Sequence, residues 1–284
     1  MKVIDPTPLM GGIRNLRDKI ELLTKSWSLS NKGQEELSKS YLNQLANNFF
    51  DKPYALHEST LMFIYLFHGE QITEEIKKML DEFRAAKKNY PAEYLRFRSY
   101  YISEKSESFL ENRLDDLKDY LNNYDDLVNV YLYVKNKKEI PENISPSSKR
   151  FRQLKMFYGN IYESITSDLF VLACINNILN GRQFDIFNKM DLKKYMTINK
   201  ANRANAFKDR LTFNPIVQHL DSKLRNASHH GAMKLRNNTI KYRSGGTGAS
   251  HTISYIKYLE KCNHLMFASC ILFAFGLLLL NDGI

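Results

Sequence analysis

The chain has 284 residues, of which 43% are hydrophobic and 12% aromatic. This composition supports a packed core and excludes a disordered chain, and the low content of Gly (12) and Pro (7) favours a mainly helical fold. The net charge is +10, and the window 182–243 alone holds 14 Lys/Arg against 4 Asp/Glu. This basic window predicts binding to a polyanion, although a solvated basic surface has the same composition.

Three cysteines without a close CxxC pair, and an N-terminal segment without an apolar run, predict a reducing, cytoplasmic location. Residues 1–138 are predicted to form an N-terminal helical domain, because apolar residues recur there at helical spacing. A buried helix is expected over 54–67 and a long amphipathic stretch over 104–138. Asn31 can cap a helix that begins just after it.

Segment 139–149 contains two prolines among polar residues and predicts a linker to a second domain, 150–284. This second domain is expected to begin with one long apolar helix ending at Asn180-Gly181. A basic helix is then expected over 190–209. The next helix is expected to begin at Pro215, with Asn214 as its cap and Gly231 as its stop. A loop over 239–252 and a last helix over 253–280 complete the predicted domain. Four principal helices predict an all-α fold with a C-terminal four-helix bundle.

The last predicted helix carries no charge between Leu265 and Leu280. A membrane span usually needs about 20 apolar residues. We expect a central bundle helix or a dimer interface, with a C-terminal tail anchor as the alternative.

Six residues, Arg225-Asn226-Ala227-Ser228-His229-His230, place an arginine, an amide and two histidines within two turns of a predicted helix. Arg225 and His229 are four residues apart and share one face, and Asn226 and His230 share the neighbouring face. These residues can be explained without function, as a polar cluster at a solvated helix end. They can also be explained by function, as groups that carry out acid–base chemistry on a phosphate.

RNA carries its own nucleophile, the 2′-OH. A histidine can accept the 2′-OH proton or donate a proton to the leaving 5′-oxygen, and an arginine can stabilise the charge on the phosphoryl oxygens. The products would be a 2′,3′-cyclic phosphate and a 5′-OH. No metal or other cofactor is needed.

The segment resembles the motif of the HEPN (higher eukaryote and prokaryote nucleotide-binding) ribonucleases: arginine, a polar residue, three residues, then histidine. The resemblance covers about 148–281 and is similar to bacterial abortive-infection and toxin proteins. It implies a HEPN-like bundle in which Arg225, Asn226 and His230 are catalytic and His229 is an extra histidine. It also implies a homodimer in which two motifs share one cleft.

We therefore expect a metal-independent endoribonuclease acting in phage defence or as a toxin, with RNA as substrate and an antitoxin or regulatory protein as a possible partner. The alternative is a non-catalytic helical module that binds RNA or protein. Besides the catalytic residues, the predicted substrate-binding residues are His229, Lys223, Lys234, Arg236, Lys241 and Arg243.

Three other patterns carry weaker signals. His57-Glu58 begins like the zinc-protease motif, but Leu61 stands where the second histidine is required. A metal site built from His229, His230, His251, Cys262 and His264 would match no standard ligand spacing. The cluster Gly245–Gly248 lacks the GK[ST] ending of a P-loop and predicts a flexible loop.

Overall fold

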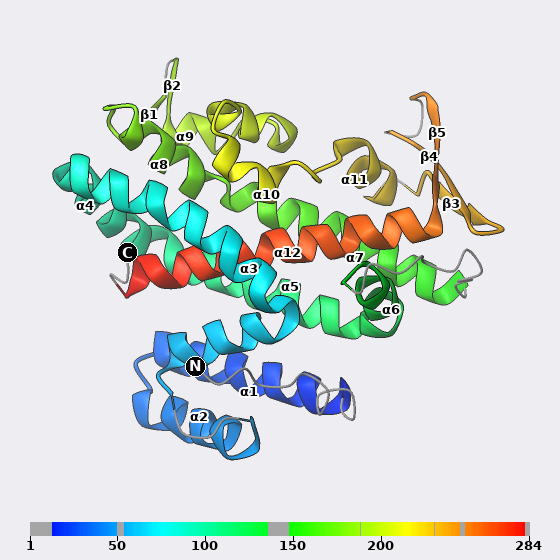
Figure 1. Cartoon of the computed structure of the whole chain (residues 1–284), viewed down its shortest axis with the longest axis horizontal. Coiled ribbons are helices and arrows are strands. Elements are labelled where there is room, and N and C mark those ends of the chain that lie inside the picture. The colour runs from blue at the N-terminus through cyan, green and yellow to red at the C-terminus, as the bar shows by residue number, and fades with distance from the viewer. Residues whose placement is uncertain are drawn as a thin grey trace.

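The computed structural model describes residues 13–49, 54–135, 148–187, 189–229, 231–244 and 248–281. The fold is mainly helical, as the all-α prediction required, with two small sheets added (Figure 1).

The helices are, in chain order, α1 (Ile13–Asn31), α2 (Glu35–Phe49), α3 (Leu56–Asn89), α4 (Pro91–Tyr100), the π-helical turn η2 (Tyr101–Lys105), α5 (Ser106–Asn122), α6 (Tyr124–Lys135), α7 (Ser148–Asp168), α8 (Phe170–Leu179), α9 (Leu192–Tyr195), the 3-10 helices η3 (Lys200–Phe207) and η4 (Leu211–Phe213), α10 (Asn214–Val217), α11 (Ser222–His229) and α12 (Tyr255–Leu280). The strands are β1 (Ile186–Phe187), β2 (Met190–Asp191), β3 (Met233–Arg236), β4 (Thr239–Arg243) and β5 (Ser250–Ser254).

Helix α12 runs through the middle of the molecule (Figure 1). It confirms the predicted last helix, and it begins at Tyr255 because the Ser254 side chain accepts a hydrogen bond from the Lys257 amide. Among the described residues α12 is the one helix long and apolar enough to cross a membrane, and 83% of that apolar stretch is buried inside the fold. Its surroundings are those of a core helix.

Helices α3, α5, α6 and α7 pack around α12. Phe83 of α3 stacks on Phe275 of α12 with ring centroids 4.7 Å apart. Because α3, α5 and α6 precede residues 136–147 and α7 follows them, the two predicted domains share one hydrophobic core. Most of the predicted linker, residues 139–147, lies outside the described residues.

The predicted helix boundaries differ from the observed ones at two places and agree at one. Asn31 ends α1 and does not cap α2, and Gly33 makes the turn with a φ of +71°. The predicted stretch 104–138 divides at Asn123, whose backbone N–H donates to the carbonyl of Tyr120. The predicted stop at Gly181 is confirmed, because this residue adopts a φ of +69° directly after α8.

The predicted basic helix over 190–209 is wrong. The segment forms strand β2, the single turn α9 and the 3-10 helix η3. Short polar side chains compete with a continuous helix here, since Asp191 Oδ1 accepts from the Lys194 amide at 2.7 Å and Asn199 Oδ1 accepts from the Ala201 amide at 3.0 Å. Each of these contacts starts a new helical turn.

The predicted loop over 239–252 is also wrong for most of its length. Strands β3, β4 and β5 form an antiparallel sheet in that order, and β4 pairs Lys241 with Lys234 on one side and with Thr252 on the other. Alternating inward and outward side chains support the strands. Asn237 and Asn238 both have positive φ and form the two-residue turn between β3 and β4.

A buried charge cluster ties α5, α7 and α12 together. Arg113 is fully buried and pairs with Asp116 (Nη1–Oδ2, 3.3 Å) and Asp168 (Nη2–Oδ2, 3.2 Å). Asp116 Oδ2 also accepts from the hydroxyls of Ser164 at 3.0 Å and Ser269 at 2.6 Å. Burial raises the pKa of Asp116 to about 7 and that of Asp168 to about 6, against the opposing effect of the one guanidinium they share.

The substitution Asp116→Asn should therefore change how stability depends on pH. A carboxyl whose pKa is raised by folding stabilises the fold when protonated, and this contribution is lost as the pH rises through its folded pKa. We expect the variant to gain about 1–3 kcal/mol relative to the wild type between about pH 5 and pH 8. Urea unfolding of both proteins at each pH measures the difference, and a difference that does not vary with pH would contradict the assignment.

Candidate functional site

Helix α11 carries the motif and is shorter than predicted. The chain does not continue as one helix from Pro215; α10 ends at Val217, and Asp221 starts α11 by accepting from the amides of Lys223 (3.0 Å) and Leu224 (3.2 Å). Neither Asn214 nor Pro215 therefore begins the motif helix. Leu224 and Ala227 are fully buried. Ser228 is buried with them, whereas Lys223 and His229 are exposed and Arg225 and Asn226 are partly exposed.

Arg225 is held by a carboxylate of a different helix. Its Nε lies against Oε1 of Glu163 on α7, and its Nη1 donates to Asn226 Oδ1 at 2.7 Å. Glu163 Oε2 also pairs with Lys200 Nζ, the first residue of η3, at 2.6 Å. The three charged side chains are each about one quarter to one third exposed. Two cations therefore flank one carboxylate at a half-buried position.

Asn226 connects α11 with the sheet. Its Oδ1 accepts from Arg225, and its Nδ2 donates to the hydroxyl of Ser244 at the end of β4, at 3.4 Å. The amide is thus oriented from both sides. Within the described residues the Nη2 group of Arg225 has no hydrogen-bond partner. This edge of the guanidinium can therefore donate hydrogen bonds to an anionic ligand.

His229 lies on the same side of α11 as Arg225. Its imidazole rests on Gly159 of α7, where an added Cβ would lie 2.6 Å from Nε2. Gly159 and Glu163 are four residues apart on α7, and His229 and Arg225 are four apart on α11. The two helices are therefore antiparallel at this contact, with Gly159 facing His229 and Glu163 facing Arg225. His229 itself is exposed.

The cations keep Glu163 ionised. Burial alone would raise the pKa of the Glu163 carboxyl, but Lys200 and Arg225 together hold it below its ordinary value. Burial, and then the neighbouring Glu163, raise the pKa of Tyr162 to about 12. Near neutral pH the Glu163 carboxyl is therefore ionised and the Tyr162 phenol is protonated.

The other predicted site residues are placed as follows. His230 lies outside the described residues. Lys223 is exposed on α11, three residues before Asn226. The remaining four predicted residues, Lys234, Arg236, Lys241 and Arg243, are all exposed on β3 and β4.

These four cations lie on one face of the β3–β5 sheet, here called the basic sheet face. Lys234 and Lys241 are directly opposite each other across the strand pair, and the neighbouring outward positions on β5 are hydroxyl residues such as Thr252. Like charges that face each other repel. In the part of the chain that the structure describes, none of the four cations forms an ion pair. The face thus presents uncompensated positive charge beside α11, which packs against β4.

Of the five residues of the metal alternative, the structure describes His229, His251, Cys262 and His264, and it does not gather them into a metal site. His251 faces inward with its ring centroid 5.4 Å from that of Tyr242, Cys262 is fully buried, and His264 stacks on His219 at 3.8 Å. Among the described residues no three His, Cys, Asp or Glu side chains gather as metal ligands would. Gly245–Thr247 of the glycine cluster lie outside the described residues.

Sequence reasoning missed Gly159, Glu163, Lys200 and Ser244. Glu163 stands in a helix recognised only by its apolar stripe, and Lys200 contributed only to the basic window. Their contact with Arg225 depends on how α7, η3 and α11 pack. Spacing along the chain therefore carried no signal for them.

The chain matches no protein-family model, and comparison with curated proteins and with solved structures finds no match.

The substitution Gly159→Ala should displace the imidazole of His229 without unfolding the protein. Alanine favours the α7 helix by about 1 kcal/mol over glycine, and the exposed ring can swing outward. We expect the NMR signals of the His229 ring to move while the unfolding free energy stays constant or rises. Gln153→Ala, at an exposed α7 position, is the matched control. Unchanged His229 signals in the Gly159 variant would argue against the contact.

Proposed function

We propose that the protein is a metal-independent endoribonuclease and that its active site is built around Arg225. The observation that carries the proposal is the arrangement on α11. The guanidinium is oriented by Glu163 and Asn226, has one edge free of described partners, and shares its helix face with the imidazole of His229. A planar guanidinium suits phosphate oxygens, and imidazole suits proton transfer near neutrality.

In the proposed reaction Arg225 binds the scissile phosphate and stabilises its developing charge. Asn226 orients the guanidinium. His230, on its resemblance to the HEPN motif, accepts the proton of the 2′-OH as this oxygen attacks phosphorus. The 5′-oxygen leaves with a proton, and the products are a 2′,3′-cyclic phosphate and a 5′-OH.

One histidine cannot both accept and donate a proton in the same step. Either His229 or the motif of a second protomer must supply the other proton transfer. We propose a homodimer with a composite site, as the HEPN resemblance implies. Sedimentation of the wild-type protein measures this directly, and a monomer with full cleavage activity would exclude it.

Support for RNA as the substrate comes from the basic sheet face. Its four cations lack ion-pair partners among the described residues, and β4 ends next to Ser244, which contacts Asn226. A phosphate backbone would relieve the repulsion between Lys234 and Lys241. We propose that a strand bound on this face continues past the end of β4 towards Arg225.

We further propose that the activity serves growth arrest or defence against phage, on the strength of the resemblance alone. Expression of the wild-type gene should then stop growth of a bacterial host, and expression of a His230→Ala variant should not. Equal growth arrest by both would refute this setting.

The substitution His230→Ala should lower RNA cleavage at least about 100-fold, because it removes a proton-transfer group. Binding of the same RNA should change little. Cleavage is measured on labelled RNA with EDTA present, and His57→Ala in α3 is the matched control. A wild-type protein that binds RNA without cutting it would support the non-catalytic module instead, and undiminished cleavage by the variant would exclude His230 from the reaction.

The double substitution Lys234→Ala, Lys241→Ala should weaken RNA binding and reduce its salt dependence. For a single strand, the slope of log K against log salt falls by about 0.7 for each phosphate that the protein no longer neutralises. We expect a slope smaller by about 1.4 if both lysines bind phosphates. Lys39→Ala, at a distant surface pair with Glu36, serves as control. An unchanged slope would remove the basic sheet face from the RNA path.

A further inference from the structure

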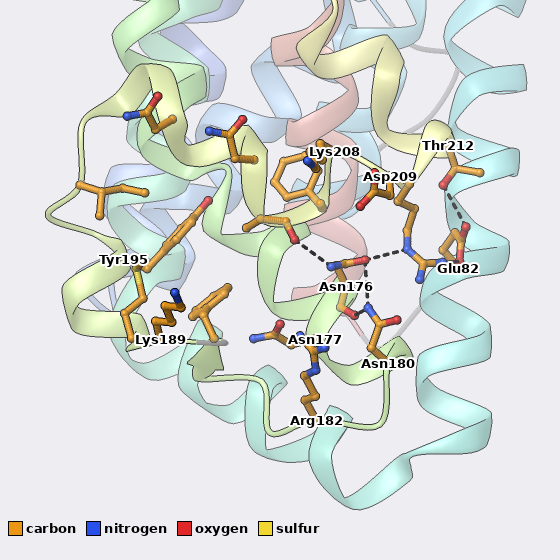
Figure 2. Close-up of a pocket in the computed structure, with 18 of the residues that line it drawn as sticks. Glu82, Asn176, Asn177, Asn180, Arg182, Lys189, Tyr195, Lys208, Asp209 and Thr212 are labelled. Carbon is orange, nitrogen blue, oxygen red and sulfur yellow. Dashed lines mark hydrogen bonds and ion pairs between the residues drawn. The ribbon is translucent and has the colours of Figure 1, made fainter.

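A cleft of about 1250 Å³ lies between α8, the β1–β2 hairpin, η3, η4 and α3. The cleft contains no residue of the α11 motif. Its lining combines amide side chains, cations and aromatic rings, and Figure 2 shows these groups around one hollow. Such convergence of polar groups around a partly apolar hollow is typical of ligand sites.

The polar wall of the cleft is rigidly constructed. Asn176 Oδ1 accepts from Arg210 Nε at 2.9 Å, and its Nδ2 donates to the carbonyl of Ala206 at 3.0 Å (Figure 2). Arg210 Nη1 pairs with Glu82 at 2.8 Å, and Thr212 donates to the other oxygen of the same carboxylate at 2.9 Å. The charge of Arg210 is therefore compensated. These contacts connect α8, η3, η4 and α3 around the cleft.

The cations at the margin of the cleft are not compensated in this way. Arg182, Lys189 and Lys208 line it and are exposed, and within the described residues none of them forms an ion pair. Asp209 is the remaining acidic residue of the lining. The local field thus favours an anionic group, and lysine and arginine are the usual partners of phosphate.

The cleft also offers groups of another kind. Phe187 and Tyr195 stack with ring centroids 4.7 Å apart and nearly parallel planes (10°), and both rings contribute to the lining. Asn180, Asn202 and Asn205 are exposed amides of the same lining. An amide both donates and accepts hydrogen bonds, as the edges of nucleobases require. The two rings are almost fully buried, at 9% and 1% exposure, and they give the cleft an apolar wall.

We propose that this cleft binds a nucleotide, with its phosphate at Arg182, Lys189 and Lys208 and its base against the asparagine amides and the Phe187–Tyr195 wall. An acidic peptide would use the cations but has no need of the three exposed asparagine amides. The nucleotide is either free or part of an RNA strand. The site goes beyond the proposed ribonuclease function and does not depend on it.

The two sites are joined by one element. Lys200, the first residue of η3, pairs with Glu163 beside Arg225, whereas Asn205 and Ala206 near the end of η3 line the cleft. Arg203, in the middle of η3, is buried and donates to the carbonyl of Thr166 on α7 at 3.1 Å. This 3-10 helix is thus anchored between the sites, and a strand bound at Arg225 can extend along it to the cleft.

The test compares the wild-type protein with a Lys189→Glu, Lys208→Glu variant and with an Asn205→Leu variant. The probes are AMP, ATP, an eight-nucleotide 2′-O-methyl oligouridine that cannot be cleaved, and inorganic phosphate, each titrated by calorimetry. The control is a Lys32→Glu, Lys39→Glu variant, with Lys32 in the turn before α2 and Lys39 in α2. It makes the same change of charge away from the cleft. Thermal melting checks that every variant is folded.

We expect the double variant to weaken binding of AMP, ATP or the oligonucleotide at least about tenfold, and the control to bind like the wild type. Asn205→Leu should weaken nucleotide binding while leaving binding of inorganic phosphate unchanged. A cleft-dependent affinity for AMP or ATP identifies a free nucleotide, and one confined to the oligonucleotide identifies an RNA strand.

The proposal is overturned if no probe binds, if binding ignores the cleft variants, or if phosphate binds as tightly as the nucleotides. His230→Ala should leave binding in the cleft unchanged. If that variant loses cleavage but keeps binding in the cleft, the nuclease proposal and the nucleotide-site proposal are independent of each other.

Discussion

Enclosure of α12 is the constraint on which the rest of the fold depends. A helix that is apolar on all sides must be covered on all sides, and α3, α5, α6 and α7 provide that cover. The cover includes charge, since Arg113, Asp116 and Asp168 are taken out of water together and are stabilised by contacts that include Ser269 of α12. These contacts fix α7 in position. Because β5 leads directly into α12, the sheet is fixed as well.

The fixed position of α7 determines the candidate site. It presents Gly159 and Glu163 to α11, so that an imidazole can lie on the backbone of one helix while a guanidinium pairs with its carboxylate. Glu163 compensates Arg225 only in part, because Lys200 shares the same carboxylate. The group of three retains a net positive charge beside the uncompensated basic sheet face. The same packing therefore orients the arginine and leaves net positive charge around it.

The sequence predicted the helical class of the fold, the last helix and the stop at Gly181, because these follow from periodicity and from local backbone preference. It also placed Arg225 and His229 on one helix face, which depends only on spacing. It did not predict the strands β3–β5, and its loop over 239–252 includes β4 and part of β5. Nor did it predict the breaks at Asp191 and Asp221, where side chains cap new turns. The contact of Glu163 with Arg225 and the cleft beside Asn176 could not be found along the chain, because each is formed by segments that meet only after packing.

The central claim is that the site at Arg225 cuts RNA with the substrate's own 2′-hydroxyl. The most direct measurement uses a short RNA whose cleaved nucleotide carries hydrogen in place of that hydroxyl, compared with the unmodified RNA in the presence of EDTA. We predict that the unmodified strand yields 2′,3′-cyclic phosphate and 5′-OH ends and that the modified strand stays intact at this position. Cleavage of the modified strand at the same position and rate, or 5′-phosphate ends on the products, would contradict the claim.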